Sequence, residues 1–121
     1  MSYREKFDLT GRVAVITGGA GLLGPEHAVA LAQAGATVAI TDINGTAADE
    51  TATRLVREHG NGRFVAMAMD VTDPDSIRQA RDTLLKRFGK INILVNNAAI
   101  DPKVKADSLV ETSRLEHFPL E

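Results

Sequence analysis

The feature that most constrains this chain is the regular alternation of two kinds of segment. Four short runs of apolar, mostly β-branched residues are separated by three longer segments of helical periodicity, and no hairpin turn joins two runs. The expected strands are Arg12–Thr17, Thr37–Thr41, Arg63–Met69 and Ile91–Val95. Such alternation is typical of parallel strands joined by right-handed helical crossovers, with helices on both faces of the sheet. The sequence therefore predicts an α/β fold with a doubly wound parallel sheet.

The segments between the strands carry the start and stop signals of helices. We expect helices over Pro25–Ala34, over Thr46–His59, and from Thr72-Asp73-Pro74 to a stop at Gly89. Proline suits the first turn of a helix, Asp and Thr cap its first N–H groups, and glycine suits its end. The residues expected on the apolar faces are Ala28, Leu31, Ala32, Ala48, Ala52, Leu55, Val56, Ile77, Ala80, Leu84 and Phe88.

Composition excludes several classes of function. The 121 residues correspond to one domain or part of one. A net charge of −2 and scattered basic residues do not suit nucleic-acid binding, and no apolar run approaches the roughly 18 residues of a membrane span. The chain has no cysteine and no spacing of metal ligands, so we expect neither disulfides nor a metal site. No signal-peptide core precedes the first strand, which favours the cytoplasm.

A glycine-rich loop, Thr17-Gly18-Gly19-Ala20-Gly21-Leu22-Leu23-Gly24, joins the first expected strand to the first helix. Backbone N–H groups and the positive end of a helix dipole converge at such a loop and bind a pyrophosphate. Gly18 would make the tight turn, Gly21 would let the backbone approach the phosphates, and Gly24 would let the helix pack against the sheet. The residues expected to contact a dinucleotide here are Gly18, Gly21, Leu22, Leu23 and Gly24. The alternative is a glycine-rich turn without a ligand.

An acidic residue, Asp42, ends the second expected strand. A carboxylate at this place can accept both hydroxyl hydrogens of the adenosine ribose and would repel a 2′-phosphate. The following Ile43 and Asn44, like Gly19 and Ala20, offer no basic group for a 2′-phosphate. The sequence therefore favours NAD over NADP, with Asp42 and Ile43 at the ribose. The alternative role for Asp42 is to cap the next helix.

Asp70 and Val71 follow the third expected strand at the same carboxyl edge of the sheet, where ligands of open α/β sheets bind. Asp70 could accept a hydrogen bond from the adenine amino group while Val71 packs on the ring. Alternatively, Asp70 only turns the chain into the helix that Thr72-Asp73-Pro74 opens.

Taken together, these motifs resemble the short-chain dehydrogenase/reductase family. The resemblance runs from about Leu9 to the end of the chain and includes the turn Asn96-Asn97-Ala98-Ala99 after the fourth strand. It implies a Rossmann-like domain of strand order 3-2-1-4. In that family an Asn-Asn-Ala-Gly turn steadies the central sheet and borders the cofactor, which implies that role for Asn96, Asn97 and Ala98.

The chain departs from the family pattern in three ways. Its glycines follow Gly-x-x-Gly-x-x-Gly, whereas the common branch has Gly-x-x-x-Gly-x-Gly, and Ala99 replaces the last glycine of the Asn-Asn-Ala-Gly turn. The chain also ends where the next long helix would begin, so we expect a single, incomplete domain with a polar loop over residues 101–121.

The family's reaction uses a Ser and a Tyr-x-x-x-Lys pair beyond the fourth strand, where the lysine lowers the pKa of the tyrosine. The one tyrosine here is Tyr3, ahead of the first strand, and the isolated His27, His59 and His117 suit a solvated surface. We therefore assign no catalytic residue. The chain alone is expected to be inactive, and a small-molecule substrate is expected only for a full-length form.

Four functions compete. The leading hypothesis is the NAD-binding portion of an oxidoreductase that transfers a hydride between NAD and an alcohol or carbonyl substrate. A non-catalytic nucleotide-binding or assembly module is the second. The glycine spacing also resembles the branch of nucleotide-sugar epimerases and dehydratases. A methyltransferase that uses S-adenosylmethionine shares the glycine loop and both strand-end acids, although Thr17 and Asn96-Asn97-Ala98 count against it.

The fourth expected strand, Ile91–Val95, would form an edge of the sheet and is almost entirely apolar. Exposed strand edges pair readily with another chain. We therefore expect a homo-oligomer that forms through this strand.

Overall fold

Four parallel strands form the single sheet of the computed structural model, which describes residues 2–60 and 63–99. They are β1 (Val13–Ile16), β2 (Thr37–Asp42), β3 (Phe64–Ala68) and β4 (Ile93–Val95). The strand order is β3-β2-β1-β4, and all three neighbouring pairs are parallel. Both the expected α/β class and the expected order 3-2-1-4 are therefore confirmed.

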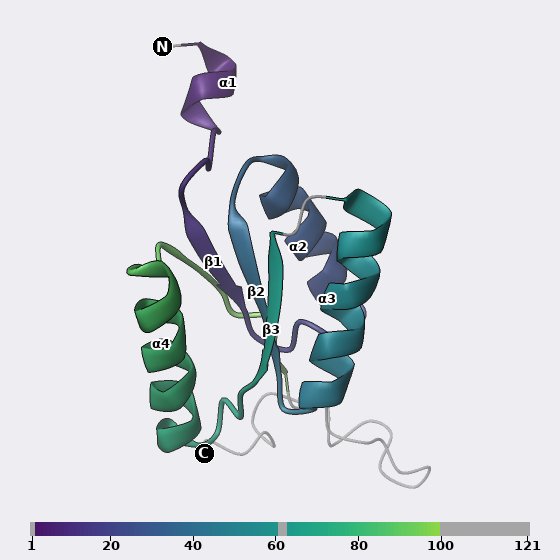
Figure 1. The fold of residues 1–121 in the computed structure, drawn as a ribbon, viewed down its shortest axis with the longest axis vertical. Helices are drawn as coiled ribbons and strands as arrows, with labels where there is room; N and C mark the ends of the chain where they lie inside the picture. Colours follow the sequence, from purple (N-terminus) through teal and green to yellow (C-terminus); the bar gives the residue numbers. More distant parts are fainter. Residues whose placement is uncertain (1, 61–62, 100–121) are drawn as a thin grey trace, which may run out of the picture.

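Helices cover both faces of this sheet. Figure 1 shows α2 (Gly24–Gln33) and α3 (Gly45–His59) on one side and α4 (Pro74–Phe88) on the other. The larger core lies under α2 and α3, where helix alanines such as Ala28 and Ala48 let the helices approach the branched side chains of the sheet. A smaller cluster of Val15, Ala39 and Leu84 joins the sheet to α4. The doubly wound arrangement is thus confirmed.

The expected apolar faces of the helices are correct except at one position. Ala80 and Leu84 of α4 are buried, and Phe88 packs against the smaller cluster. Ile77, however, is 41% exposed, which corrects the expectation that it lines the buried face. It lies in the first turn of α4, before Ala80 and Leu84, which are the buried residues of this helix.

The fourth strand is shorter than the expected Ile91–Val95 because Asn92 pairs with β1 through its side chain. The backbone N–H of Asn92 donates to the carbonyl oxygen of Val13 at 2.8 Å, and the N–H of Val13 donates to the side-chain oxygen of Asn92 at 2.9 Å. A side-chain acceptor thus replaces a backbone carbonyl at the start of the ladder, and the regular strand begins at Ile93.

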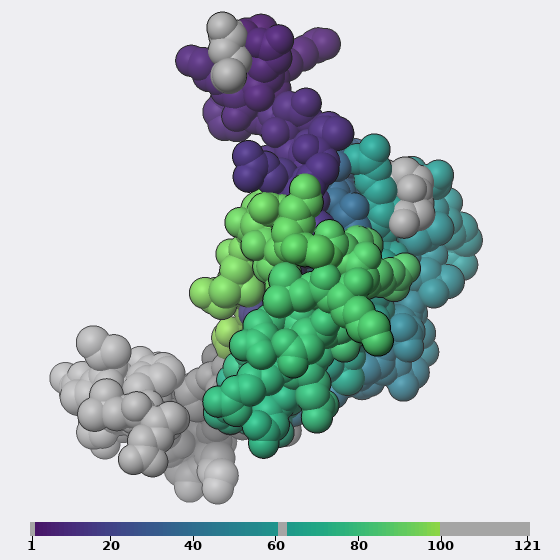
Figure 2. All heavy atoms as spheres, turned by 60° about the vertical axis from the view of Figure 1, so that its left-hand side comes forward, coloured from purple at the N-terminus to yellow at the C-terminus, as the bar shows by residue number. Residues whose placement is uncertain are grey.

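A short helix that the sequence patterns did not predict, α1 (Tyr3–Lys6), precedes the sheet. A capping box between Ser2 and Glu5 holds it, with the side chain of each residue accepting the backbone N–H of the other. Figures 1 and 2 show this segment standing clear of the sheet and its helices. Four residues are too few to display an apolar period, so periodicity could not have found this helix.

Among the described helices, none is long and apolar enough to cross a lipid bilayer. The polar loop expected over residues 101–121 lies outside the described residues.

Candidate functional site

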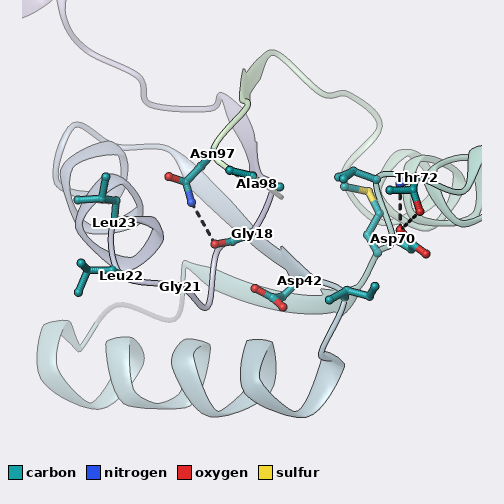
Figure 3. Close-up of a pocket in the computed structure, with 13 residues that line it drawn as sticks. Gly18, Gly21, Leu22, Leu23, Asp42, Asp70, Thr72, Asn97 and Ala98 are labelled. Atoms are coloured by element: carbon teal, nitrogen blue, oxygen red, sulfur yellow. Dashed lines mark hydrogen bonds between the residues drawn. The ribbon is translucent and has the colours of Figure 1, made fainter. Parts of the chain in front are cut away.

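A cavity of about 910 Å³ opens at the carboxyl edge of the sheet (Figure 3). Its volume lies within the roughly 300–1,000 Å³ usual for small-molecule sites. The segments that follow all four strands contribute to its walls. The described residues that line it are Gly18, Gly21, Leu22, Leu23, Asp42, Ile43, Met69, Asp70, Val71, Thr72, Asn97, Ala98 and Ala99. Ten of the twelve residues that the sequence indicated for the site are among them, and Gly24 and Asn96 are not.

Two positions of the glycine loop have no room for a side chain. Gly18 has a φ of +59°, and a Cβ atom there would lie 2.8 Å from the Cα atom of Ala98. A Cβ atom on Gly19 would lie 2.8 Å from Cγ2 of Ile40, a requirement that the sequence analysis missed. The loop therefore lies flush against β2 on one side and against the turn after β4 on the other.

Gly24 has a different role from the expected one. A Cβ atom on Gly24 would lie 2.6 Å from the carbonyl carbon of Gly19, so α2 begins in contact with the backbone of the loop. The expectation that Gly24 lets the helix pack against the sheet is corrected accordingly: the close contact is with Gly19. This contact fixes the start of α2 relative to the loop.

The amino end of α2 is free of side-chain caps. Leu23 occupies the N-cap position and makes no side-chain hydrogen bond to the helix, and Pro25 stands in the first turn. The first N–H groups of a helix have no partner within the helix and carry the positive end of its dipole. Because Leu22 and Leu23 line the cavity, this end of α2 can offer N–H donors to an anionic ligand there.

Asp42 lies at the end of β2, with its carboxylate on the cavity wall (Figure 3). One carboxylate oxygen, Oδ2, accepts the N–H of Ala20 at 3.1 Å, and Oδ1 accepts the N–H of Asn44 at 3.0 Å. Asn44 itself caps α3 by accepting the N–H of Ala47 at 3.0 Å. The helix cap that was the alternative role for Asp42 therefore belongs to Asn44.

Asp70 follows β3 and both lines the cavity and shapes the chain turn before α4. Its Oδ1 accepts the hydroxyl of Thr72 at 2.6 Å and the backbone N–H of Thr72 at 2.9 Å. The Thr72 hydroxyl, and after it the Thr72 N–H, lowers the pKa of Asp70, since both bonds favour the carboxylate. The cap of α4 is Asp73, which accepts the N–H of Asp75. Asp70 thus turns the chain while it remains on the cavity wall.

The turn after β4 is tied to the end of β1 by Thr17. Its hydroxyl oxygen accepts the N–H groups of Asn97 and Ala98, both at 3.0 Å, and its hydroxyl donates to the carbonyl oxygen of Val95 at 3.4 Å. The side-chain amide of Asn97 donates to the carbonyl oxygen of Gly18 at 3.0 Å (Figure 3). Asn97 and Ala98 thus border the cavity and brace the sheet, whereas Asn96 is exposed.

Ala99 replaces the family's glycine without backbone strain. The described residues include no residue other than glycine with a positive φ, so Ala99 occupies an ordinary backbone conformation. Its methyl group adds to the cavity wall.

Apolar side chains form much of the cavity surface. Leu22 is 92% exposed and Ile43 is 72% exposed, and Leu23 and Val71 are also exposed. Asp42 and Asp70 are the charged residues among the described lining residues, which include no lysine or arginine. The cavity therefore combines apolar flanks, two carboxylates and a glycine loop at the start of a helix.

Five residues that shape the site were not among those expected to contact the dinucleotide: Thr17, Gly19, Met69, Thr72 and Ala99. Met69 and Thr72 flank Asp70 and Val71, so their closeness to the predicted pair was a signal for them. Elsewhere in the described chain, His27 and His59 are exposed, as expected, while His117 lies outside the described residues. Between residues 2 and 99 as described, no group of three or more His, Asp or Glu side chains could hold a metal ion.

Comparison of the sequence with known proteins finds a matching family model and related dehydrogenases. The sequence model of the short chain dehydrogenase family matches residues 12–117. Sorbitol dehydrogenase of Cereibacter sphaeroides is 46% identical over 92 residues, which cover 76% of this chain and 34% of that protein. D-threitol dehydrogenase of Mycolicibacterium smegmatis is 38% identical over 103 residues, which cover 85% of this chain and 39% of that protein.

The fold has matching solved structures. A short-chain type dehydrogenase/reductase from Mycobacterium marinum superposes with a TM-score of 0.74 and 36% sequence identity, over 83% of this chain and 40% of that chain. The chain spans between 34% and 40% of the length of these three relatives.

Proposed function

Because this chain belongs to the short-chain dehydrogenase family, we propose that it binds NAD in the cavity at the carboxyl edge of its sheet. The observation that carries the proposal is the convergence of three features on one cavity. These are the glycine loop, the uncapped start of α2 and the carboxylate of Asp42. A dinucleotide needs all three, for its pyrophosphate and its adenosine ribose.

The loop suits a pyrophosphate because its glycines carry no side chains that would keep a ligand away from the backbone. Gly21 lines the cavity, and a Cβ atom added there would lie only 3.3 Å from the carbonyl oxygen of Gly18, so glycine leaves the backbone accessible to a ligand. Phosphate oxygens could then accept the N–H groups at the start of α2, where the helix dipole favours negative charge.

Asp42 suits the adenosine ribose. A carboxylate offers about four lone-pair positions, and the N–H groups of Ala20 and Asn44 use two of them. The others can accept the two ribose hydroxyls of NAD. A 2′-phosphate would meet the negative charge of Asp42, and no described lining residue carries a compensating positive charge. We infer from this a preference for NAD over NADP.

The adenine ring would lie between apolar side chains. Ile43 and Val71 both line the cavity with exposed side chains, and burying them against a ring removes apolar surface from water. The hydroxyl and N–H of Thr72 use two of the roughly four lone-pair positions of the Asp70 carboxylate, so the others can accept a hydrogen bond from the adenine amino group.

The reaction we propose for the parent enzyme is hydride transfer between NAD and an alcohol or carbonyl substrate. The printed names of two relatives, a sorbitol dehydrogenase and a D-threitol dehydrogenase, support an alcohol as the substrate class. NAD, when bound, supplies the group that accepts the hydride. The bound NAD would be oriented by the glycine loop, by Asp42 and by the turn after β4.

We further propose that the 121-residue chain alone transfers no hydride. The family's reaction uses a tyrosine with a nearby lysine as its proton-transfer group. The one tyrosine of the chain, Tyr3, lies in α1, which stands at the end of the sheet opposite the cavity (Figure 1). A spectrophotometric assay for NADH formation with polyol substrates would reveal any turnover.

A second copy of the chain is the proposed partner. In the described sheet, β4 pairs with β1 and forms an edge, and Leu94 on this edge is 58% exposed. An apolar edge with unpaired backbone groups can add a strand from another chain. This supports a homo-oligomer through the segment Ile91–Val95.

The proposed function can be tested by calorimetric titration of the purified chain with NAD and, separately, with S-adenosylmethionine. We expect saturable binding of one NAD per chain and no heat from S-adenosylmethionine. Binding of S-adenosylmethionine without binding of NAD would contradict the proposal and favour the methyltransferase alternative.

A further inference from the structure

The contacts of Asp42 point to a second role for this residue, beyond recognition of the ribose. Two successive N–H groups of the glycine loop are held by the end of β2. The N–H of Gly19 donates to the carbonyl oxygen of Thr41 at 2.8 Å, and the N–H of Ala20 donates to Oδ2 of Asp42 at 3.1 Å. The first of these bonds is made by the backbone, and the second depends on one side chain.

Asp42 is itself fixed by its other oxygen. Oδ1 accepts the N–H of Asn44, whose side chain caps α3, so the carboxylate is oriented from both sides. Steric contacts reinforce this arrangement, because Gly19 lies against Ile40 and Gly24 lies against Gly19. The loop segment that precedes the start of α2 is therefore clamped between β2 and α2.

We propose that Asp42 is a positioning residue for the phosphate loop as well as a ligand of the ribose. Its negative charge strengthens the bond from Ala20, since hydrogen bonds to charged groups contribute more than neutral ones. The same carboxylate then sets the position of the loop and accepts the ribose hydroxyls. This inference rests on the proposed binding of NAD, and it adds that the ribose and pyrophosphate subsites are coupled through one side chain.

The coupling has a consequence for cofactor preference. Removing the carboxylate would relieve the repulsion of a 2′-phosphate, but it would also release the loop that holds the pyrophosphate. We therefore expect Asp42→Ala to lose affinity for NAD without gaining comparable affinity for NADP.

The test separates the two roles with a ligand that cannot donate a hydrogen bond to Asp42. The ligand is an NAD analogue whose adenosine ribose is 2′,3′-dideoxy, and its affinity is measured for the wild-type chain, Asp42→Ala and Asp42→Asn. If Asp42 only recognises the ribose, both variants bind the analogue at least as tightly as the wild type. If Asp42 also positions the loop, Asp42→Ala binds the analogue about tenfold more weakly than the wild type, which corresponds to the loss of one hydrogen bond to a charged group.

A measurement on the free protein makes the test independent of any ligand. Amide hydrogen exchange of Ala20 should be about tenfold faster in Asp42→Ala, while the amide of Gly19, which donates to the backbone of Thr41, keeps its protection. Asp42→Asn retains one acceptor oxygen, so its Ala20 exchange rate should lie between the two. Asp49→Ala removes an exposed carboxylate of α3 and serves as the matched control that leaves both amides unchanged.

Unchanged exchange of Ala20 in Asp42→Ala would overturn the positioning role. Faster exchange with undiminished affinity for the dideoxy analogue would overturn the coupling between the subsites. If the wild-type chain binds neither NAD nor the analogue, the proposed function fails, and the exchange rates still decide whether Asp42 holds the loop.

Discussion

The hydroxyl oxygen of Thr17 accepts the backbone N–H of Asn97 at 3.0 Å, across 80 positions of the sequence. The same oxygen accepts the N–H of Ala98, and the hydroxyl donates to Val95. A hydroxyl has one donor and two acceptor positions, so Thr17 uses its full capacity. The end of β1 is thereby joined to the turn after β4, whose residues Asn97 and Ala98 line the cavity.

Thr17→Val is expected to lower the free energy of unfolding by about 2–4 kcal/mol. Valine keeps the shape of threonine but leaves the N–H of Ala98 without an acceptor, at about 1–3 kcal/mol. The N–H of Asn97 keeps only its bond to the carbonyl oxygen of Val95 at 3.0 Å, which adds a loss of about 0.5–1.5 kcal/mol. Thr17→Ser keeps the hydroxyl and loses one methyl group, worth about 1 kcal/mol. Urea denaturation compares the two variants, and a Thr17→Val protein as stable as Thr17→Ser would contradict this account of the turn.

Gly24→Ala is expected to destabilise the fold by about 1–3 kcal/mol, the usual range for overpacking. The added methyl group would meet the backbone of Gly19, which β2 prevents from moving away. Gly21→Ala is the comparison variant, because its methyl group would lie 3.3 Å from the carbonyl oxygen of Gly18, a tight contact but not an overlap. We expect Gly21→Ala to be less destabilised than Gly24→Ala. Equal stabilities for the two variants in urea would refute the tight contact at Gly24.

Thr72→Val is expected to raise the pKa of Asp70 toward its ordinary value, since the Thr72 hydroxyl is the main cause of the lowering. A carboxyl pKa that is lower in the folded state stabilises the fold above the ordinary pKa, and that stabilisation is lost as the pH falls through the lowered value. The variant should lose less stability over this acidic interval than the wild type. Carboxyl carbon chemical shifts followed by NMR during a pH titration measure the change, and an Asp70 pKa that does not move would contradict the prediction.

Leu94→Lys is expected to weaken self-association of the chain. Burying a leucine is worth about 1.5–3 kcal/mol, and a charge on an edge strand opposes pairing with another edge. Light scattering over a dilution series should show a larger average mass for the wild type than for Leu94→Lys at the same concentration. Gln33→Lys adds the same charge on the exposed side of α2 and should associate like the wild type. A monomeric wild-type chain at high concentration would show that the edge recruits no partner.

Local patterns sufficed to predict the succession of strands and helices along the chain and the acids at the carboxyl edge, whereas the strand order 3-2-1-4 in the sheet was implied by the family resemblance. Asp42 and Asp70 end apolar runs, and parallel strands bring such ends to one edge of a sheet. The correct position of both residues on the cavity followed from the parallel topology alone.

Contacts between distant segments could not be predicted in this way. Gly19 must be glycine because the pairing of β1 with β2 brings Ile40 against it, and no local pattern contains that contact. The three bonds of Thr17 likewise depend on β4 lying beside β1. Ile77 fits the helical period of its segment but is 41% exposed, because its burial depends on how α4 packs on the sheet and not on the period alone.

The most direct test of the central claim is the ratio of the dissociation constants of NAD and NADP for the wild-type chain, measured by calorimetry at one ionic strength. We predict that NAD binds at least about tenfold more tightly, because the ribose hydroxyls of NAD donate to Asp42 whereas a 2′-phosphate is repelled by it. Equal affinity for the two dinucleotides would contradict the role of Asp42, and the absence of any binding of NAD would contradict the account of the cavity as its site.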